Sequence, residues 1–216
     1  MKHLIVGYGE VGKALHKVLG EAYIIDGDKL LSTNELKPVD VVHICFPYSK
    51  NFKEEVNVYK KLNALIIVHS TVPVGTCDEL GVTHSPIRGI HPYLEKGIRT
   101  FVKYFGGKEA HKAALIFFDL GIKTREFKDA KITEALKLWD TTQYGRLIML
   151  EKEIHQWCVD HNVDFEEVYI NANKDYNEGY VKLGRPDVVR PWLTHMDGPI
   201  GGHCVVPNAK LLGVEL

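Results

Sequence analysis

The chain has 216 residues, of which 45% are hydrophobic and 25% are charged, as in a folded globular protein rather than a disordered one. Its 27 basic and 28 acidic residues give a net charge of -1, so there is no basic excess for neutralising nucleic-acid phosphates. No apolar run approaches the roughly 20 residues that cross a bilayer. We therefore expect neither a nucleic-acid nor a membrane partner.

The first part of the chain alternates between strand and helix patterns. A short apolar run at residues 3–6 enters a glycine-rich loop, apolar residues at helical spacing follow at 11–19, and a second strand is expected at 22–25. This is a βαβ unit. The further strands are expected at residues 39–46, 64–68, 82–84, 100–105 and 123–127, and the helices between them at 51–62, 77–80 and 109–120. The alternation predicts a doubly wound parallel α/β sheet of the Rossmann type over residues 1–129.

The pattern changes after Asp129. Residues 130–161 predict one long helix, residues 165–175 a second, and residues 187–193 a third, whereas residues 195–207 are expected to form a loop. The sequence therefore predicts a second, α-helical domain over residues 130–216. The long helix is apolar on more than one side and needs a partner, which favours a homodimer.

The glycine loop carries the firmest functional prediction. Its six residues match G-x-G-x-x-G between a strand and a helix: Gly7, Tyr8, Gly9, Glu10, Val11 and Gly12. The glycines permit a tight turn, close approach of the backbone to a pyrophosphate, and close packing of helix on strand. Asp26 follows the second strand, where its carboxylate would bind the ribose hydroxyls and repel a 2′-phosphate. We expect NAD rather than NADP as the cofactor.

Further motifs resemble those of the nucleotide-sugar dehydrogenases, which oxidise UDP-glucose, GDP-mannose or UDP-N-acetylmannosamine to uronic acids. The matching segments, in chain order, are IDGDK at 25–29, VHICFP at 42–47, STVPVGT at 70–76, SPIR at 85–88, EALK at 134–137 and GGHCVVP at 201–207. The resemblance spans nearly all of this chain but about half of a family member, because the family continues with a second Rossmann-like domain. It places Phe46, Pro47, Ser70 and Thr71 beside the cofactor.

The resemblance also implies a mechanism. NAD takes a hydride from the C6 alcohol of the sugar, a cysteine captures the aldehyde, a second hydride leaves, and water hydrolyses the thioester. Cys204 matches the cysteine, Lys137 matches the lysine that stabilises the oxyanion, and Thr71 matches a threonine that holds the water.

Three positions depart from the family pattern. Ile87 replaces the glutamate of S-P-E-R, Thr141 replaces an asparagine four residues after the lysine, and Asn208 replaces an aspartate four residues after the cysteine. Because Ile87 cannot accept a proton, thioester hydrolysis is weakened. We expect a truncated or diverged relative that acts on a sugar nucleotide or a smaller hydroxy substrate.

Alternatives remain open at this stage. The chain is either an NAD-dependent oxidoreductase or an NAD-binding module without full turnover, regulatory or dependent on a partner chain. His69, His84, His91 and His203 could form a zinc site with Cys204, but none of them has the close spacing of a metal motif, so no metal is expected. The four cysteines are widely spaced, which favours a reduced, cytoplasmic setting.

Overall fold

The protein is described by a computed structural model covering residues 1–32, 37–200 and 204–216. Its contacts divide it into two compact units, Met1–Lys137 and Leu138–Leu216. Within the described residues, eight strands form one sheet in the order β3-β2-β1-β4-β5-β6-β7-β8. The strands are β1 His3–Val6, β2 Ala22–Asp26, β3 Lys29–Leu30, β4 Val41–Ile44, β5 Leu65–Val68, β6 Thr83–His84, β7 Lys103–Gly106 and β8 Thr124–Phe127.

Most neighbouring strands are parallel, which confirms the predicted Rossmann-type fold. Two pairings are antiparallel and were not predicted. β3 turns back on β2 through the two residues Gly27 and Asp28, and a loop this short can only join antiparallel strands. β7 meets β6 through a single antiparallel bridge between His84 and Gly106.

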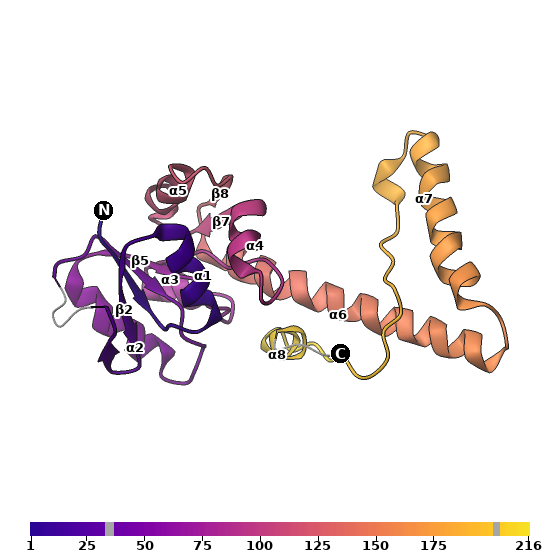
Figure 1. Ribbon diagram of the computed structural model, residues 1–216, viewed down its shortest axis with the longest axis horizontal. Helices are drawn as coiled ribbons and strands as arrows, with labels where there is room; N and C mark the ends of the chain where they lie inside the picture. The colour runs from indigo at the N-terminus through magenta and orange to yellow at the C-terminus, as the bar shows by residue number, and fades with distance from the viewer. Residues whose placement is uncertain (33–36, 201–203) are drawn as a thin grey trace. The chain divides into compact units, whose positions relative to one another are not determined.

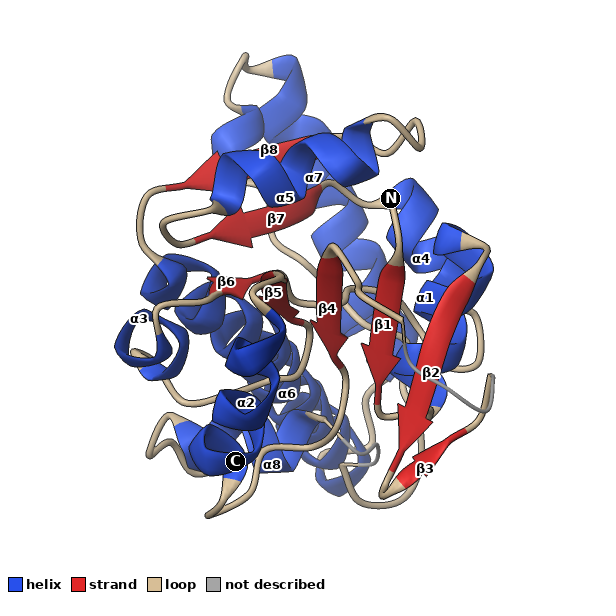
Figure 2. Ribbon diagram, turned by 90° about the vertical axis from the view of Figure 1, so that its left-hand side faces the viewer, coloured by secondary structure: helices blue, strands red, loops and turns tan. Residues whose placement is uncertain are grey.

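Helices cover both faces of the sheet because strand residues alternate between two apolar clusters (Figure 2). On one face, Ile5, Val41 and Ile67 pack with α1 (Glu10–Leu19), α4 (Leu94–Thr100) and α5 (Ala110–Phe118). On the other face, residues such as Leu4 and Val42 pack with α2 (Phe52–Tyr59) and α3 (Thr76–Leu80). A single turn, η1 (Lys60–Leu62), extends α2.

Residues 94–100 differ from the prediction, which included no helix there and began a strand at residue 100. They form α4, which buries Leu94 and Ile98 against the sheet cluster and packs beside α1. Gly97 lets α4 approach the backbone of the preceding loop, since a Cβ on it would lie 2.5 Å from the carbonyl oxygen of Arg88. The helix therefore depends on a tertiary contact that the local pattern does not reveal.

The long helix α6 (Ala130–Asp160) is continuous, as predicted (Figure 1). In the second unit it is followed by the π-helical turns η2 (Glu166–Asn171), the helix α7 (Ala172–Lys182), the short turn η3 (Pro186–Val188) and the helix α8 (Val205–Leu211). α8 packs on α6 at Gly145, where a Cβ would lie 2.6 Å from Val205. No helix among the described residues has the length and apolar character needed to cross a membrane.

Three predictions in this unit were wrong. The second helical run continues to Lys182 instead of ending at Asp175, and stops where Gly184 adopts a φ of 73°. The helix expected at 187–193 is only the turn η3, because Pro191 disfavours helical backbone at Arg190. Arg190 instead contacts α7, where its backbone exchanges hydrogen bonds of 2.7 and 2.9 Å with the Asn177 side chain. The expected loop at 195–207 contains the start of α8.

Candidate dinucleotide-binding site

The glycine loop lies where the chain order of the sheet reverses, between the carboxyl ends of β1 and β4. Gly7 has a φ of +92°, and a Cβ on it would lie 2.7 Å from the backbone nitrogen of Phe46. A Cβ on Gly12 would lie 2.0 Å from the carbonyl oxygen of Gly7. These two positions therefore require glycine for the loop itself to form, before any ligand is considered.

Gly9 is different, because no atom lies within 4 Å of the position its Cβ would occupy. Its φ of -70° and ψ of -160° are open to any residue. Gly9 caps the ten-residue helix α1, whose first backbone N–H groups have no partner within the helix. The open space beside these donors is what a pyrophosphate group needs.

Asp26 lies at the end of β2 and faces this loop. Its Oδ1 accepts a hydrogen bond of 3.0 Å from the backbone nitrogen of Tyr8. A hollow of about 350 Å³ opens here, and Asp26, Asp28 and Glu55 line it together with the apolar side chains of Phe46 and Tyr59. An apolar floor with carboxylates at its rim suits an adenosine whose ribose hydroxyls donate hydrogen bonds, and it disfavours additional phosphate charge.

The loops that follow β4 and β5 are joined at the same edge of the sheet. Ser70 Oγ donates a hydrogen bond of 2.6 Å to the carbonyl oxygen of Phe46. Ser70 is buried, Phe46 and Thr71 are partly exposed, and Pro47 is exposed. The residues expected beside the cofactor thus lie together at the carboxyl ends of the parallel strands, where ligands bind in open α/β sheets.

The remaining loop residues have protein contacts of their own. The Tyr8 hydroxyl lies 2.7 Å from His16 Nδ1, and Glu10 pairs with His91 at 2.6 Å. Val11 packs against the sheet cluster. These three side chains therefore have contacts within the protein itself.

Glu134 and His84 organise this edge of the sheet, and the sequence alone did not assign them that role. Glu134 lies on α6, and its carboxylate accepts hydrogen bonds from the backbone nitrogens of Gly75 at 2.6 Å and Cys77 at 2.8 Å. His84 lies 2.8 Å from Thr133 Oγ1 and 3.2 Å from the Ser70 carbonyl oxygen. In the sequence, Glu134 belongs to the EALK segment and His84 ends an expected strand, whereas their burial beside backbone polar groups is seen only in the structure.

Lys137 belongs to the same neighbourhood. Burial lowers the pKa of His84 to about 3, and the positive charges of Lys103 and Lys137 act in the same direction. Lys137 therefore lies close enough to His84 to act on its charge. His84 in turn contacts the carbonyl oxygen of Ser70, the residue before the predicted catalytic residue Thr71.

The second unit brings together two other predicted residues. Asn208 Nδ2 donates a hydrogen bond of 3.0 Å to Thr141 Oγ1, and Asn208 is buried. Cys204 precedes the first turn of α8 and is a partly exposed free thiol. Gly201, Gly202 and His203 of the same motif lie outside the described residues.

The position that departs most from the resemblance is buried. Ile87 is 6% exposed and belongs to the apolar cluster on one face of the sheet. An apolar residue packed in this way leaves no group at position 87 to orient a water molecule.

Three of the four histidines considered for zinc are engaged by other groups, and His203 lies outside the described residues. His69 and His84 are hydrogen-bonded on both ring nitrogens, and His91 pairs with Glu10. Across residues 1–32, 37–200 and 204–216, no three histidine, cysteine or acidic side chains are grouped so that they could hold a metal ion.

Solved structures of dehydrogenases share this fold. The chain aligns with UDP-D-ManNAc dehydrogenase from Pyrococcus horikoshii at a TM-score of 0.75 and 18% identity, covering 98% of this chain and 63% of that one. It aligns with GDP-mannose dehydrogenase from Pseudomonas aeruginosa at a TM-score of 0.66 and 18% identity, covering 100% of this chain and 66% of that one. A third similar structure is 3-hydroxyisobutyrate dehydrogenase from Mycobacterium tuberculosis, with a TM-score of 0.63, 16% identity, and coverage of 98% of this chain and 78% of that one.

These similarities establish the fold and no more, because the identities are low. The chain spans less than two thirds of the length of the sugar-nucleotide dehydrogenases it matches. No protein-family model matches the sequence, and no curated protein matches it.

Proposed function

We propose that this protein is an NAD-dependent oxidoreductase that transfers a hydride from an alcohol of a sugar nucleotide or of a smaller hydroxy substrate. The observation that carries the proposal is the loop at Gly7–Gly12, where two glycines are required by packing and Gly9 is open toward the start of α1. The Rossmann-type sheet and its similarity to dehydrogenase structures support it. Bound NAD would supply the hydride acceptor, and the chain would bind and orient it.

The preference for NAD over NADP rests on charge. Asp26, Asp28 and Glu55 line the hollow beside the loop. A 2′-phosphate placed there would meet three carboxylates, whereas ribose hydroxyls would donate hydrogen bonds to Asp26. Titration calorimetry should find NAD binding at least tenfold tighter than NADP, and Asp26→Asn should narrow that difference. Equal affinity for both cofactors would contradict the assignment.

The chemistry is assigned to five side chains. Cys204 is the proposed covalent nucleophile, Lys137 the oxyanion-stabilising cation, and Thr71, Thr141 and Asn208 the groups that position the reactants. The Asn208–Thr141 hydrogen bond supports a joint role for the last two. We further propose a small-molecule substrate, a homodimer formed through α6, and a cytoplasmic location.

The test is NADH formation, followed by absorbance at 340 nm with a panel of nucleotide sugars and hydroxy acids. The wild type is compared with Cys204→Ala and with Cys158→Ala, a matched control for a cysteine buried on α6. We expect Cys204→Ala to abolish aldehyde oxidation and Cys158→Ala to retain it. Activity that is insensitive to Cys204→Ala would remove the cysteine from the mechanism.

A second candidate function is an NAD-binding module without full turnover. The specific observation in its favour is Ile87, which is packed in the apolar core where the resemblance leads us to expect a catalytic glutamate. Submicromolar to micromolar NAD binding with no turnover on any substrate of the panel would favour this module over the oxidoreductase.

A further inference from the structure

Three buried histidines lie in a diagonal row across one face of the sheet. His3 opens β1 beside Val41, His43 lies in β4 between Ile5 and Ile67, and His69 follows β5. Each histidine is therefore two residues further toward the carboxyl ends of the strands than the one before it, and residues two apart share a face. The row leads from the amino-terminal edge of the sheet to the edge that carries Ser70 and Thr71.

The three rings are hydrogen-bonded to one another. His3 Nδ1 lies 3.0 Å from His43 Nε2, and His43 Nδ1 lies 3.0 Å from His69 Nε2. His69 Nδ1 lies 2.7 Å from the carbonyl oxygen of Ser85. At the outer end, His3 is 8% exposed and lines a surface hollow of about 600 Å³.

The Ser85 carbonyl determines which nitrogen of each ring carries the proton. A carbonyl oxygen only accepts, so His69 Nδ1 must donate to it. In a neutral ring this leaves His69 Nε2 as an acceptor for the proton on His43 Nδ1, and His43 Nε2 as an acceptor for the proton on His3 Nδ1. Within residues 1–32, 37–200 and 204–216, Nε2 of His3, which lines the hollow, is then the acceptor of the row without a hydrogen-bond partner.

The charges around the row keep it neutral at pH 7. Burial is the main cause that lowers the pKa of all three histidines, and for His43 and His69 the lowering is large. Asp40 and the terminal amine face His3, whereas Lys103 faces His43 and His69, and His84 faces His69.

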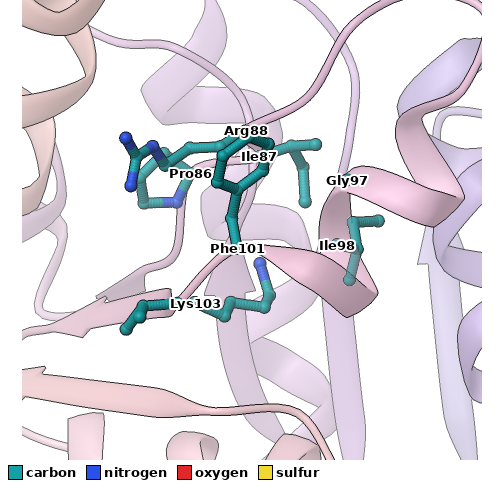
Figure 3. A pocket seen from close by; sticks show the side chains of 8 residues that line it. Pro86, Ile87, Arg88, Gly97, Ile98, Phe101 and Lys103 are labelled. Atoms are coloured by element: carbon teal, nitrogen blue, oxygen red, sulfur yellow. The ribbon is translucent and has the colours of Figure 1, made fainter.

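Lys103 is itself buried at the inner end of the row. Its Nζ donates to the Ser85 carbonyl oxygen at 3.3 Å, and burial lowers its pKa to about 7. Figure 3 shows Lys103 near Ile87, Ile98 and Phe101. These residues line a void of about 10 Å³. No carboxylate offsets its charge in these contacts, so protonated Lys103 repels a proton on His69.

We propose that His3, His43 and His69 form a proton relay that connects solvent at the amino-terminal edge of the sheet with His69 beneath the candidate cofactor edge. A solvent proton binds Nε2 of His3. The Nδ1 proton of His3 moves to Nε2 of His43, and the Nδ1 proton of His43 moves to Nε2 of His69. One N–H bond forms for each that breaks, and the positive charge arrives on His69, which now carries both ring protons.

The relay stands on the described geometry and does not need bound cofactor. Its use in catalysis, as a buried path that delivers the proton consumed when the reaction runs from carbonyl to alcohol, rests on the proposed function. The experiment below contains neither NAD nor substrate, so failure of the relay and failure of the proposed oxidoreductase are distinguishable.

The test is nitrogen NMR of the full chain labelled with 15N-histidine. At neutral pH we expect the Nδ1–H tautomer on all three rings and scalar couplings across both N–H···N bonds. On acidification, with the fold monitored by circular dichroism, the three rings should shift with one common midpoint. His84 is equally buried but outside the row, and it should not shift with them.

Variants separate a relay from three independent rings. His43→Phe, and independently His3→Phe, should abolish the pH response of His69, whereas His111→Gln on the surface should leave the midpoint unchanged. Lys103→Met should move the common midpoint to higher pH because it removes a repelling charge. An Nε2–H tautomer at His43 or His69, or titration of His3 alone in the wild type, would overturn the relay.

Discussion

The three glycines of the nucleotide loop differ in what surrounds them. Gly7 and Gly12 are held against backbone atoms of the loop itself, whereas Gly9 borders open space. The same motif therefore contains two positions constrained by folding and one that is constrained only if a ligand occupies the loop. Substitutions at Gly7 or Gly12 therefore test the stability of the loop, whereas substitutions at Gly9 test ligand binding.

Gly12→Ala should reduce the stability of the fold, whereas Gly9→Ala should reduce the affinity for NAD. Gly12→Ala places a methyl group against the Gly7 carbonyl and should cost on the order of 2–4 kcal/mol of unfolding free energy. Gly9→Ala should leave the urea midpoint nearly unchanged but weaken NAD binding roughly tenfold or more, a loss of about 1.4 kcal/mol. Full NAD affinity in Gly9→Ala would show that the pyrophosphate does not lie at this loop.

His84 should make the folded protein sensitive to acid. Its pKa is lowered to about 3 by burial, so between the ordinary histidine value near 6.5 and pH 3 the unfolded chain binds a proton that the folded chain does not. The contribution of neutral His84 to the free energy of unfolding is therefore complete above pH 6.5. It falls by about 1.4 kcal/mol per pH unit as the pH drops from 6.5 toward 3.

Urea unfolding at pH 7.5, 6.5 and 5.5 checks this expectation. His84→Gln retains a donor for the Ser70 carbonyl but cannot titrate. The free energy of unfolding of this variant should therefore fall less steeply on acidification than that of the wild type, by about 1.4 kcal/mol per pH unit. His111→Gln, at an exposed position, should behave like the wild type. An unchanged slope in His84→Gln would contradict the assignment of a neutral histidine.

At the scale of the elements, α3 and the start of α6 hold each other through two carboxylates. Asp78 on α3 accepts hydrogen bonds from the backbone nitrogens of Ala130 at 2.8 Å and Lys131 at 3.1 Å, which are the first of α6. Glu134 on α6 accepts from Gly75 and Cys77 at the start of α3. Each helix therefore satisfies the free N–H groups of the other.

Removing either carboxylate should destabilise the first unit. Asp78→Ala should cost about 1–2 kcal/mol, as for a lost helix cap, and Glu134→Ala more, because it leaves buried backbone donors without a partner. Glu79→Ala is a matched control on the same helix, since its exposed ion pair with Lys53 is worth less than about 1 kcal/mol. The measurement is chemical denaturation, and equal losses in all three variants would contradict the mutual capping.

At the scale of the whole molecule, α6 exposes large apolar side chains along much of its length. Trp139, Leu150 and Trp157 are each about half exposed. Large exposed apolar patches are typical of association surfaces. The proposed homodimer would bury these residues.

Sedimentation equilibrium tests the dimer. Trp139→Glu and Trp157→Glu should each weaken self-association at least tenfold, because each places a charge in a surface that must lose its water. Phe118→Glu introduces the same charge at an exposed aromatic residue of α5 and should leave the association unchanged. A monomeric wild type at all concentrations would contradict the proposal.

Local sequence patterns predicted most of the sheet but few of the packing-dependent helices. The apolar strands and the long helix were predicted because periodicity and length are local properties. α4 and α8 were missed, since each is seven residues long and depends on contacts made elsewhere in the chain. The opposite error occurred at residues 187–193, where a helix was predicted but only the turn η3 forms. Pro191 restricts the backbone of Arg190, and Arg190 is hydrogen-bonded to Asn177 on α7.

By itself, the sequence determined the Rossmann-type class, the glycine loop and Asp26, because these depend on residue types at fixed spacing along the chain. Only the tertiary structure decided which polar residues meet. The row from His3 to His69, the capping by Glu134 and the hydrogen bond between Thr141 and Asn208 join residues between 26 and 67 positions apart. Their distances follow from strand register and helix packing, which are fixed by burial of the whole core and not by local spacing.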